Sequence, residues 1–86
     1  MKHNVYILVS ELTGDYYKGY TADPARRLAE HNNNQSTFTA DKGPWKMIFL
    51  SVSETKKEAL QFEKKLKRQH RRYLDWLLTQ PINLIK

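Results

Sequence analysis

The residues of this chain that could carry out acid-base or phosphate chemistry occur in a simple order. Tyr6 and Tyr17 lie eleven residues apart in apolar segments, Arg27 and His31 lie four residues apart, and an isolated acid, Glu63, follows much later. Residues four apart on a helix project from one face, so Arg27 and His31 can approach a common phosphate. Arginine offers phosphate a planar fork that is always charged, and histidine exchanges protons near neutral pH. The alternative is that Arg26 and Arg27 form a solvated pair and that His31 sits at a helix end, where the helix dipole favours it.

Glu63 stands on the apolar stripe of its helical segment rather than on the charged face. The stripe is made by Ala59, Phe62 and Leu66. A carboxylate taken out of water is costly unless a cation or hydrogen bonds compensate, so we expect a partner side chain or a metal ion opposite Glu63. The alternative is that Glu63 lies at the edge of the stripe and pairs with Lys67, one turn further on.

Tyr6 and Tyr17 lie in strand-like segments, where most tyrosines are core aromatics with hydroxyls at the water boundary. Gly19 follows Tyr17 by two residues and therefore lies on the same face of a strand. Because glycine weakens the packing of a strand, its presence indicates close approach by a ligand or by another backbone segment.

The composition favours a polyanionic partner, because 15 Lys and Arg against 9 Asp and Glu give a net charge of +6. Nucleic acid is the first candidate. A basic run in the later helical region could hold several phosphates in a sequence-independent, salt-dependent way, although a solvated, charge-rich helix is equally common. The run consists of Lys56, Lys57, Lys64, Lys65, Lys67, Arg68, Arg71 and Arg72.

The length and the absences in the sequence narrow the class of protein. We expect one domain over residues 1–86 with a thin core, built from a single layer of helices against a small sheet. The chain has no cysteine, which rules out disulfides and thiolate zinc sites and fits a reducing cytoplasm. It has neither an apolar run of signal-peptide length nor the ~20 apolar residues that span a bilayer. We therefore expect a cytoplasmic protein with no membrane partner and no obligate protein partner.

Turn and capping signals divide the first half of the chain into two strands and a helix. Residues 5–10 and 16–21 are predicted strands, joined as a hairpin by a turn that contains Gly14 and Asp15. Asp23 before Pro24 predicts a helix start. Proline has no backbone N–H, and at the first position of a helix that N–H would have no partner within the helix. This helix should run to His31 and stop in the asparagine run that follows.

The second half of the sequence is predicted to form one more strand and two helices. Residues 45–52 form an apolar strand, preceded by a loop over residues 35–45. Thr55 and Glu58 have capping-box spacing, and a break near residues 69–72 should divide the helical region behind them. A right-handed crossover in this β-β-α-β-α-α order predicts an α+β domain, whose three-stranded antiparallel sheet has the strand order 2-1-3 and is flanked by helices.

Four motifs in these elements resemble those of one nuclease family. Asn4-Val5-Tyr6 matches a Gly-Ile-Tyr signature and Tyr17-Lys18-Gly19 matches Tyr-Ile-Gly. The helix segment 26–32 and the acidic segment, with Glu58-Ala59 and Glu63-Lys64, also match. Over nearly its whole length the chain resembles the GIY-YIG nuclease domain, and most closely small stand-alone members related to the amino-terminal nuclease module of the DNA-repair excinuclease.

The resemblance implies a divalent-metal-dependent endonuclease that hydrolyses phosphodiester bonds in DNA, in repair or recombination, with RNA left open. It assigns Tyr6, Tyr17, Arg27 and Glu63 to the catalytic site and His31 beside them, with Glu63 holding one Mg²⁺ or Mn²⁺. Arg27 is preferred to Arg26 as the phosphate ligand because of its i, i+4 spacing to His31. The residues expected to contact nucleic acid are Lys18, Arg26, Lys64, Lys67, Arg68 and Arg71.

The sequence departs from the family pattern at three places. Asn4 replaces a glycine and Lys18 an isoleucine, but neither position supplies a reacting side chain. The late asparagine of the family has no secure match, since Asn83 lies in the tail. Two alternatives stay open: a catalytically weak or inactive nucleic-acid-binding module on the same fold, and a small interaction domain whose tyrosines are simply core residues.

Overall fold

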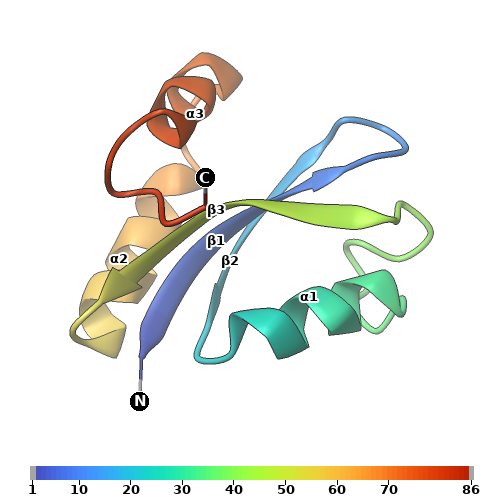
Figure 1. The fold of residues 1–86 in the computed structure, drawn as a ribbon, viewed down its shortest axis with the longest axis horizontal. Helices are drawn as coiled ribbons and strands as arrows, with labels where there is room; N and C mark the ends of the chain where they lie inside the picture. Colours follow the sequence, from blue (N-terminus) through green and yellow to red (C-terminus); the bar gives the residue numbers. More distant parts are fainter. Residues whose placement is uncertain (1, 86) are drawn as a thin grey trace.

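Three antiparallel strands in the order β2-β1-β3 form the centre of the molecule (Figure 1). The structure is a computed structural model and describes residues 2–85. The strands are β1 (His3–Ser10), β2 (Tyr16–Thr21) and β3 (Trp45–Ser53), and the helices are α1 (Pro24–Asn32), α2 (Lys56–Leu66) and α3 (Arg71–Leu78). The predicted α+β class, element order and strand order are confirmed.

Helices cover both faces of the sheet, with α1 on one side and α2 and α3 on the other (Figure 1). The single helical layer that the composition suggested was therefore wrong, whereas the apolar residues on both faces of segment 5–10 fit cover on both sides. Because side chains alternate along a strand, the central strand β1 contributes side chains to two separate cores. Val5 and Ile7 face α2 and α3, while Tyr6 and Leu8 face α1.

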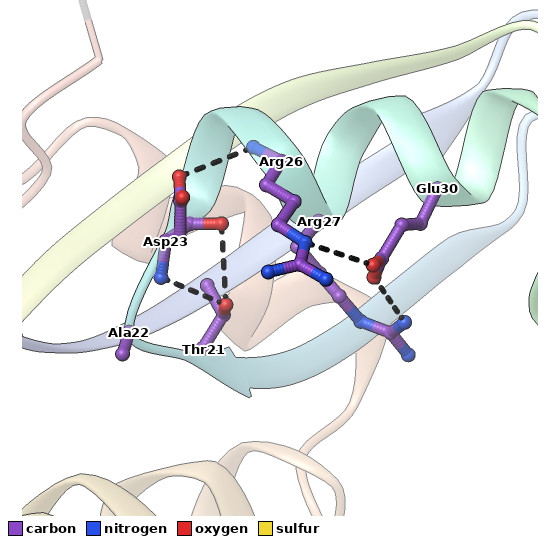
Figure 2. A pocket seen from close by; sticks show the side chains of 6 residues that line it. All are labelled: Thr21, Ala22, Asp23, Arg26, Arg27 and Glu30. Carbon is purple, nitrogen blue, oxygen red and sulfur yellow. Dashed lines mark hydrogen bonds and ion pairs between the residues drawn. The ribbon is translucent and has the colours of Figure 1, made fainter.

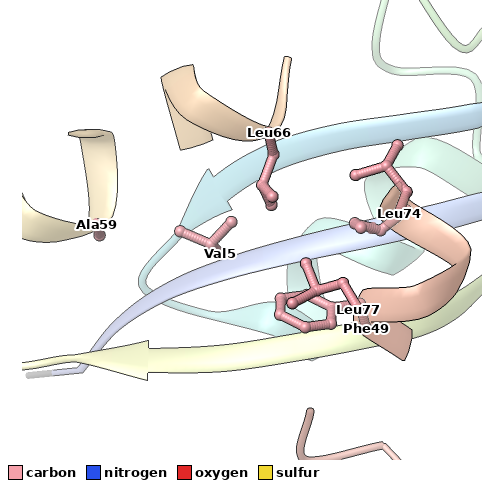
Figure 3. Packing of buried hydrophobic residues seen from close by; sticks show 7 residues of the cluster. Val5, Phe49, Ala59, Leu66, Leu74 and Leu77 are labelled. Carbon is pink, nitrogen blue, oxygen red and sulfur yellow. The ribbon is translucent and has the colours of Figure 1, made fainter. Parts of the chain in front are cut away.

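The larger core lies under α2 and α3 (Figure 3). Phe49 joins the two β1 side chains from the neighbouring strand. The buried residues from the helices are small or aliphatic, and the aromatic Phe62 and Tyr73 pack against them partly buried. The buried members of this core are Val5, Ile7, Phe49, Ala59, Leu66, Leu74 and Leu77.

The predicted helix starts are present in detail. The carboxylate of Asp23 accepts a hydrogen bond from the backbone N–H of Arg26 at 3.2 Å, and Pro24 opens α1. The hydroxyl of Thr55 accepts from the backbone N–H of Glu58 at 3.1 Å and bonds the Glu58 carboxylate at 3.0 Å. These caps satisfy N–H groups that have no partner inside the helix.

The hairpin register places the signature residues on one face. Tyr6 pairs with Gly19 and Leu8 with Tyr17 across β1 and β2. Tyr6, Tyr17 and Gly19 therefore all face α1, as their spacing predicted, whereas Lys18 pairs with Ile7 and faces α2.

The tail after α3 returns along β3 and is held there by Asn83. The buried amide of Asn83 accepts from the backbone N–H of Leu50 at 3.1 Å and of Ile85 at 3.0 Å. It donates to the carbonyls of Ile48 at 3.0 Å and Leu78 at 3.1 Å. Asn83 thus fastens the tail to the sheet.

In residues 2–85 no helix is long and apolar enough to cross a membrane.

Candidate active site

Tyr6 lies at the centre of the sheet with its ring stacked over Gly19. Its exposed fraction is 1%. A Cβ atom built on Gly19 would lie 2.5 Å from Cζ and 2.9 Å from Cε1 of Tyr6, which is far inside normal contact. The close approach expected at Gly19 is confirmed, but the approaching group is the Tyr6 side chain rather than a ligand or a backbone segment.

The Tyr6 hydroxyl joins His31 and Arg27 in one hydrogen-bonded chain. Its oxygen lies 2.9 Å from Nε2 of His31 and accepts from Nε of Arg27 at 3.3 Å. The other ring nitrogen of His31, Nδ1, lies 2.7 Å from the hydroxyl of Thr39. His31 and Thr39 are fully buried, so their polar atoms depend on these bonds. His31 is therefore a core residue and not a solvated helix-end histidine.

Tyr17 completes the aromatic side of the cluster. Its ring centroid is 4.8 Å from that of His31 and 6.3 Å from that of Tyr6, with the rings inclined to each other. Tyr17 is half-buried, whereas Tyr6 and His31 are sealed. The structure thus gathers Tyr6, Tyr17, Arg27 and His31 on the α1 face of the sheet.

Burial fixes the protonation states of Tyr6 and His31 at neutral pH. It raises the pKa of Tyr6 to about 12, against the opposing influence of Arg27, so the phenol keeps its proton. It lowers the pKa of His31 to about 4, helped by the positive charge of Arg27, so the imidazole is neutral. Desolvation works to lower the pKa of Arg27, but hydrogen bonds to Glu30 and Tyr6 outweigh it and hold that pKa above its usual value. A protonated phenol therefore faces a neutral imidazole and a permanent cation.

A pocket of about 270 Å³ opens beside Arg27 at the start of α1 (Figure 2). In the pocket Glu30 pairs with Arg27 at 3.0 Å and with Arg26 at 3.4 Å. Arg26 is otherwise exposed and does not share in the bond to Tyr6. The hydrogen bond from Arg27 lowers the pKa of Glu30, so both arginines carry a carboxylate counter-ion. The pocket lining consists of Thr21, Ala22, Asp23, Arg26, Arg27 and Glu30.

Glu63 comes from α2, on the far side of the sheet from α1. Its side chain is 19% exposed and lies 3.7 Å from Nζ of Lys67, as the pairing alternative predicted. Helix α2 packs against the edge strand β2 as well as β1. The charge of Glu63 contributes, after larger effects, to the raised pKa of Tyr6, so the two groups interact electrostatically. No hydrogen bond of the described residues joins Glu63 to the cluster on the α1 face.

The other basic residues differ in their freedom to meet a phosphate. Lys64, Lys67 and Arg68 are exposed at the end of α2, and Lys18 is half-buried beneath it. Arg71 is already engaged. Its guanidinium lies 3.4 Å from the centre of the Tyr16 ring, contacts Asp75 at 3.3 Å and donates to the carbonyl of Gly14 at 3.2 Å. Arg71 thereby fastens α3 to the hairpin.

The carboxylates suit at most a simple metal site. Among residues 2–85 no group of three or more His, Cys, Asp or Glu side chains could hold a metal ion together. Glu63 offers one partly exposed carboxylate whose contact with Lys67 is long. One protein carboxylate, with water and phosphate oxygens completing the shell, is a common arrangement for Mg²⁺. The donor set therefore fits a single hard ion held by Glu63.

Two residues of the cluster, Thr39 and Glu30, were not identified from the sequence. Thr39 lies in the loop after α1, eight residues from His31, and a lone threonine in a polar loop has no distinguishing pattern. Glu30 has i, i+4 spacing to Arg26 and i, i+3 spacing to Arg27, which is a recognisable ion-pair signal.

Comparisons with known proteins show the family to which the chain belongs. The family model of the GIY-YIG catalytic domain matches residues 2–76. The chain therefore belongs to the GIY-YIG family. A GIY-YIG domain is a nuclease domain, which implies a nucleic-acid substrate and, in general, a divalent metal.

Relatives and solved structures share most of the chain. A UPF0213 protein of Streptococcus pneumoniae serotype 4 is 41% identical over 73 residues, which cover 83% of this chain and 74% of that protein. The solution NMR structure of the UPF0213 protein BH0048 from Bacillus halodurans matches with a TM-score of 0.62 and 31% identity, over 95% of this chain and 87% of that one. The E. faecalis protein EF2693 matches with a TM-score of 0.62 and 33% identity, over 93% and 90%. The similarity thus extends over sequence and fold together.

Proposed function

We propose that this protein is a divalent-metal-dependent endonuclease that hydrolyses phosphodiester bonds in DNA, in repair or recombination. The observation that carries the proposal is the hydrogen-bonded chain from Arg27 through Tyr6 to His31, within electrostatic range of Glu63. A purely structural core has little reason to bury a phenol and an imidazole in hydrogen-bonding contact beside a partly exposed guanidinium. The family relationship supports the same conclusion.

Arg27 is the residue proposed to bind the scissile phosphate. Its guanidinium lines the pocket and is paired with Glu30, which a phosphate oxygen would replace. Arginine matches the geometry of phosphate oxygens and stays charged. Its fixed positive charge would stabilise the negative charge that builds on the phosphate oxygens during attack.

Tyr6 and His31 are proposed to handle the proton of the attacking water. A phenol with a pKa of about 12 is protonated at neutral pH and cannot accept a proton while it keeps its own. Nε2 of neutral His31 lies 2.9 Å from the hydroxyl and can take that proton as the water gives its own to Tyr6. Thr39 stays bonded to Nδ1 and keeps the ring in place throughout. Tyr17 packs on the imidazole and limits water on that side.

Glu63 is proposed to hold one Mg²⁺ or Mn²⁺. When bound, such an ion supplies Lewis-acid stabilisation of the phosphate and leaving oxygens. Lys18, Lys64, Lys67, Arg68 and, on its exposed side, Arg26 would hold the neighbouring phosphates. Arg71 could join them only by giving up its contacts with Tyr16 and Asp75.

The second candidate is a nucleic-acid-binding module on this fold that cleaves slowly or not at all. Two observations favour the binding module: Tyr6 is buried, and Arg27 is paired with Glu30. A phosphate can reach the Arg27-Tyr6-His31 hydrogen bonds only after Tyr6 becomes accessible and the ion pair opens. The exposed lysines on α2 would serve either function.

A plasmid assay separates the two. Purified protein is incubated at low salt with supercoiled plasmid in EDTA, in Mg²⁺ and in Mn²⁺. We expect nicking only with metal, and its loss in Glu63→Ala. Salt-sensitive binding without nicking, unchanged by Glu63→Ala, would favour the binding module. Neither binding nor nicking would contradict both.

A further inference from the structure

The second surface feature of note is an aromatic hollow on α3, away from the α1 face. It has a volume of about 680 Å³ and is lined by His70, Arg72, Tyr73 and Trp76. All four side chains end in planar groups, and none is acidic or aliphatic. We define these four residues as the aromatic hollow.

Trp76 is the most unusual member of the aromatic hollow. Helix α3 buries Leu74 and Leu77 against the sheet, yet Trp76 is 53% exposed. Its ring centroid lies 5.5 Å from that of Tyr73, with the planes inclined by 44°. Trp76 therefore packs against the Tyr73 ring while about half of its surface stays exposed. The other tryptophan, Trp45, is buried at 5% exposure.

The guanidinium of Arg72 gives the aromatic hollow a positive charge. Arg72 is exposed and takes part in none of the ion pairs among residues 2–85. His70 precedes α3 but forms no side-chain capping bond. The acid of this helix, Asp75, is occupied by Arg71 and by the Tyr16 hydroxyl at 2.6 Å. A negatively charged, planar ligand would therefore meet attraction and no competing carboxylate.

We propose that the aromatic hollow binds an unpaired nucleobase of the nucleic-acid substrate, stacked on Trp76, with the adjoining phosphate held by Arg72. Aromatic platforms combined with basic side chains are the common means of binding single strands, because every base has a face that can stack. Arginine adds both stacking and phosphate pairing. A base inside a duplex has no free face, so the hollow selects strands with unpaired bases.

The position of the aromatic hollow fits a strand that leaves the proposed cleavage site. The exposed Lys64, Lys67 and Arg68 lie between Glu63 and the hollow along the chain. The molecule measures 32 × 30 × 24 Å, so a stacked strand advancing about 3.4 Å per nucleotide would cross it in about nine nucleotides. The inference rests on the proposed function and adds to it a substrate class: DNA with a single-stranded segment close to the scissile bond.

Binding measured without cleavage tests the aromatic hollow. Fluorescence anisotropy in EDTA compares a labelled single strand with its blunt duplex for wild type, Trp76→Phe and Trp76→Leu. Phenylalanine keeps a stacking face and leucine keeps only apolar area. We expect Trp76→Phe to retain single-strand affinity and Trp76→Leu to lose about tenfold, with duplex affinity unchanged. Equal single-strand affinities for the two variants would overturn the proposal.

Intrinsic fluorescence gives a second readout that does not depend on the leucine variant being folded. Because Trp45 is buried and Trp76 exposed, a stacked base should quench mainly Trp76. We expect the single strand to quench the tryptophan fluorescence of wild type but not that of Trp76→Phe; quenching that persists in Trp76→Phe would contradict the proposal.

Sedimentation of wild type and Trp76→Leu tests the alternative occupant of the aromatic hollow, a second copy of the chain. Self-association that is lost in Trp76→Leu, with unchanged single-strand binding, would identify that copy as the occupant.

The two proposals fail separately. If the protein nicks plasmid in the presence of metal but its single-strand affinity does not depend on Trp76, only the proposal for the aromatic hollow is refuted. Absence of nicking with Trp76-dependent single-strand binding would refute the endonuclease and keep the base site.

Discussion

Gly19→Ala should damage the cluster through a single added methyl group. The new Cβ would lie 2.5 Å from Cζ of Tyr6. The ring would have to move by about 1 Å to regain an ordinary separation of ~3.5 Å. Tyr6 is 1% exposed, so it has no free space to move into. A shift of that size also breaks its hydrogen bonds to His31 at 2.9 Å and to Arg27 at 3.3 Å.

The expected cost follows from these contacts. Overpacking of this kind costs about 1–3 kcal/mol, and each lost hydrogen bond adds about 1 kcal/mol. For a domain of this size the unfolding midpoint should fall by at least about 10 °C. Metal-dependent nicking should fall with it, because the phenol no longer meets the imidazole.

Circular dichroism during thermal and urea unfolding measures the effect, with Gly43→Ala as the matched control. A Cβ on Gly43 would meet its nearest atom at 3.7 Å, an ordinary contact, so this variant should resemble wild type. In a Tyr6→Leu background the clashing atoms are absent. Gly19→Ala should then cost less than about 1 kcal/mol, a coupling of at least about 2 kcal/mol between the two positions. An equal cost in both backgrounds would refute the stacking of Tyr6 on Gly19 as the reason for the glycine.

Three further variants test other parts of the structure. Burial lowers the pKa of His31 to about 4 from 6.5, so between these values the unfolded chain binds the extra proton. The free energy of unfolding should therefore fall by about 2 kcal/mol as pH drops from neutral to about 5. Urea unfolding across this range should show a flatter profile in His31→Gln, and an unchanged slope would contradict the buried neutral ring. Asn83→Ala removes four hydrogen bonds to backbone groups and should cost about 2–4 kcal/mol in urea unfolding; a loss below about 0.5 kcal/mol would be inconsistent with its role in holding the tail. Glu30→Gln frees Arg26 and Arg27 from their counter-ion, so duplex affinity should rise and its log-log salt slope steepen by about 0.9 for each additional phosphate neutralised. Weaker binding measured by anisotropy would mean that Glu30 orients Arg27 rather than competing for it.

Local signals in the sequence predicted most of the fold. The Asp23-Pro24 and Thr55-Glu58 caps act within four residues, so their helices begin where the sequence places them. The break in the helical region is at residues 67–70, close to the prediction of 69–72. Strand β1 begins at His3 rather than at residue 5, because Asn4 is buried and donates to the carbonyl of Ser51 on β3. Such cross-strand bonds leave no periodic trace in the sequence.

The site was predictable only in part. Strand alternation placed Tyr6, Tyr17 and Gly19 on one face, and helical spacing placed Arg27 and His31 together. The partner of His31 in the loop could not be found this way, because the position of Thr39 depends on how a polar loop folds back over α1. The raised pKa of Tyr6 likewise depends on burial in the core on the α1 side, which a single layer of helices over the other face would leave open.

Cleavage by this protein should depend on the carboxylate of Glu63. Single-turnover cleavage of a labelled duplex in Mg²⁺ should be measured for wild type, Glu63→Gln and Glu58→Gln. Both acids lie on α2, and a glutamine at position 58 can still serve the capping box. We predict that Glu63→Gln lowers the rate by at least about 100-fold while Glu58→Gln stays within about twofold of wild type. Equal rates for the two folded variants would contradict the role of Glu63 as the metal ligand.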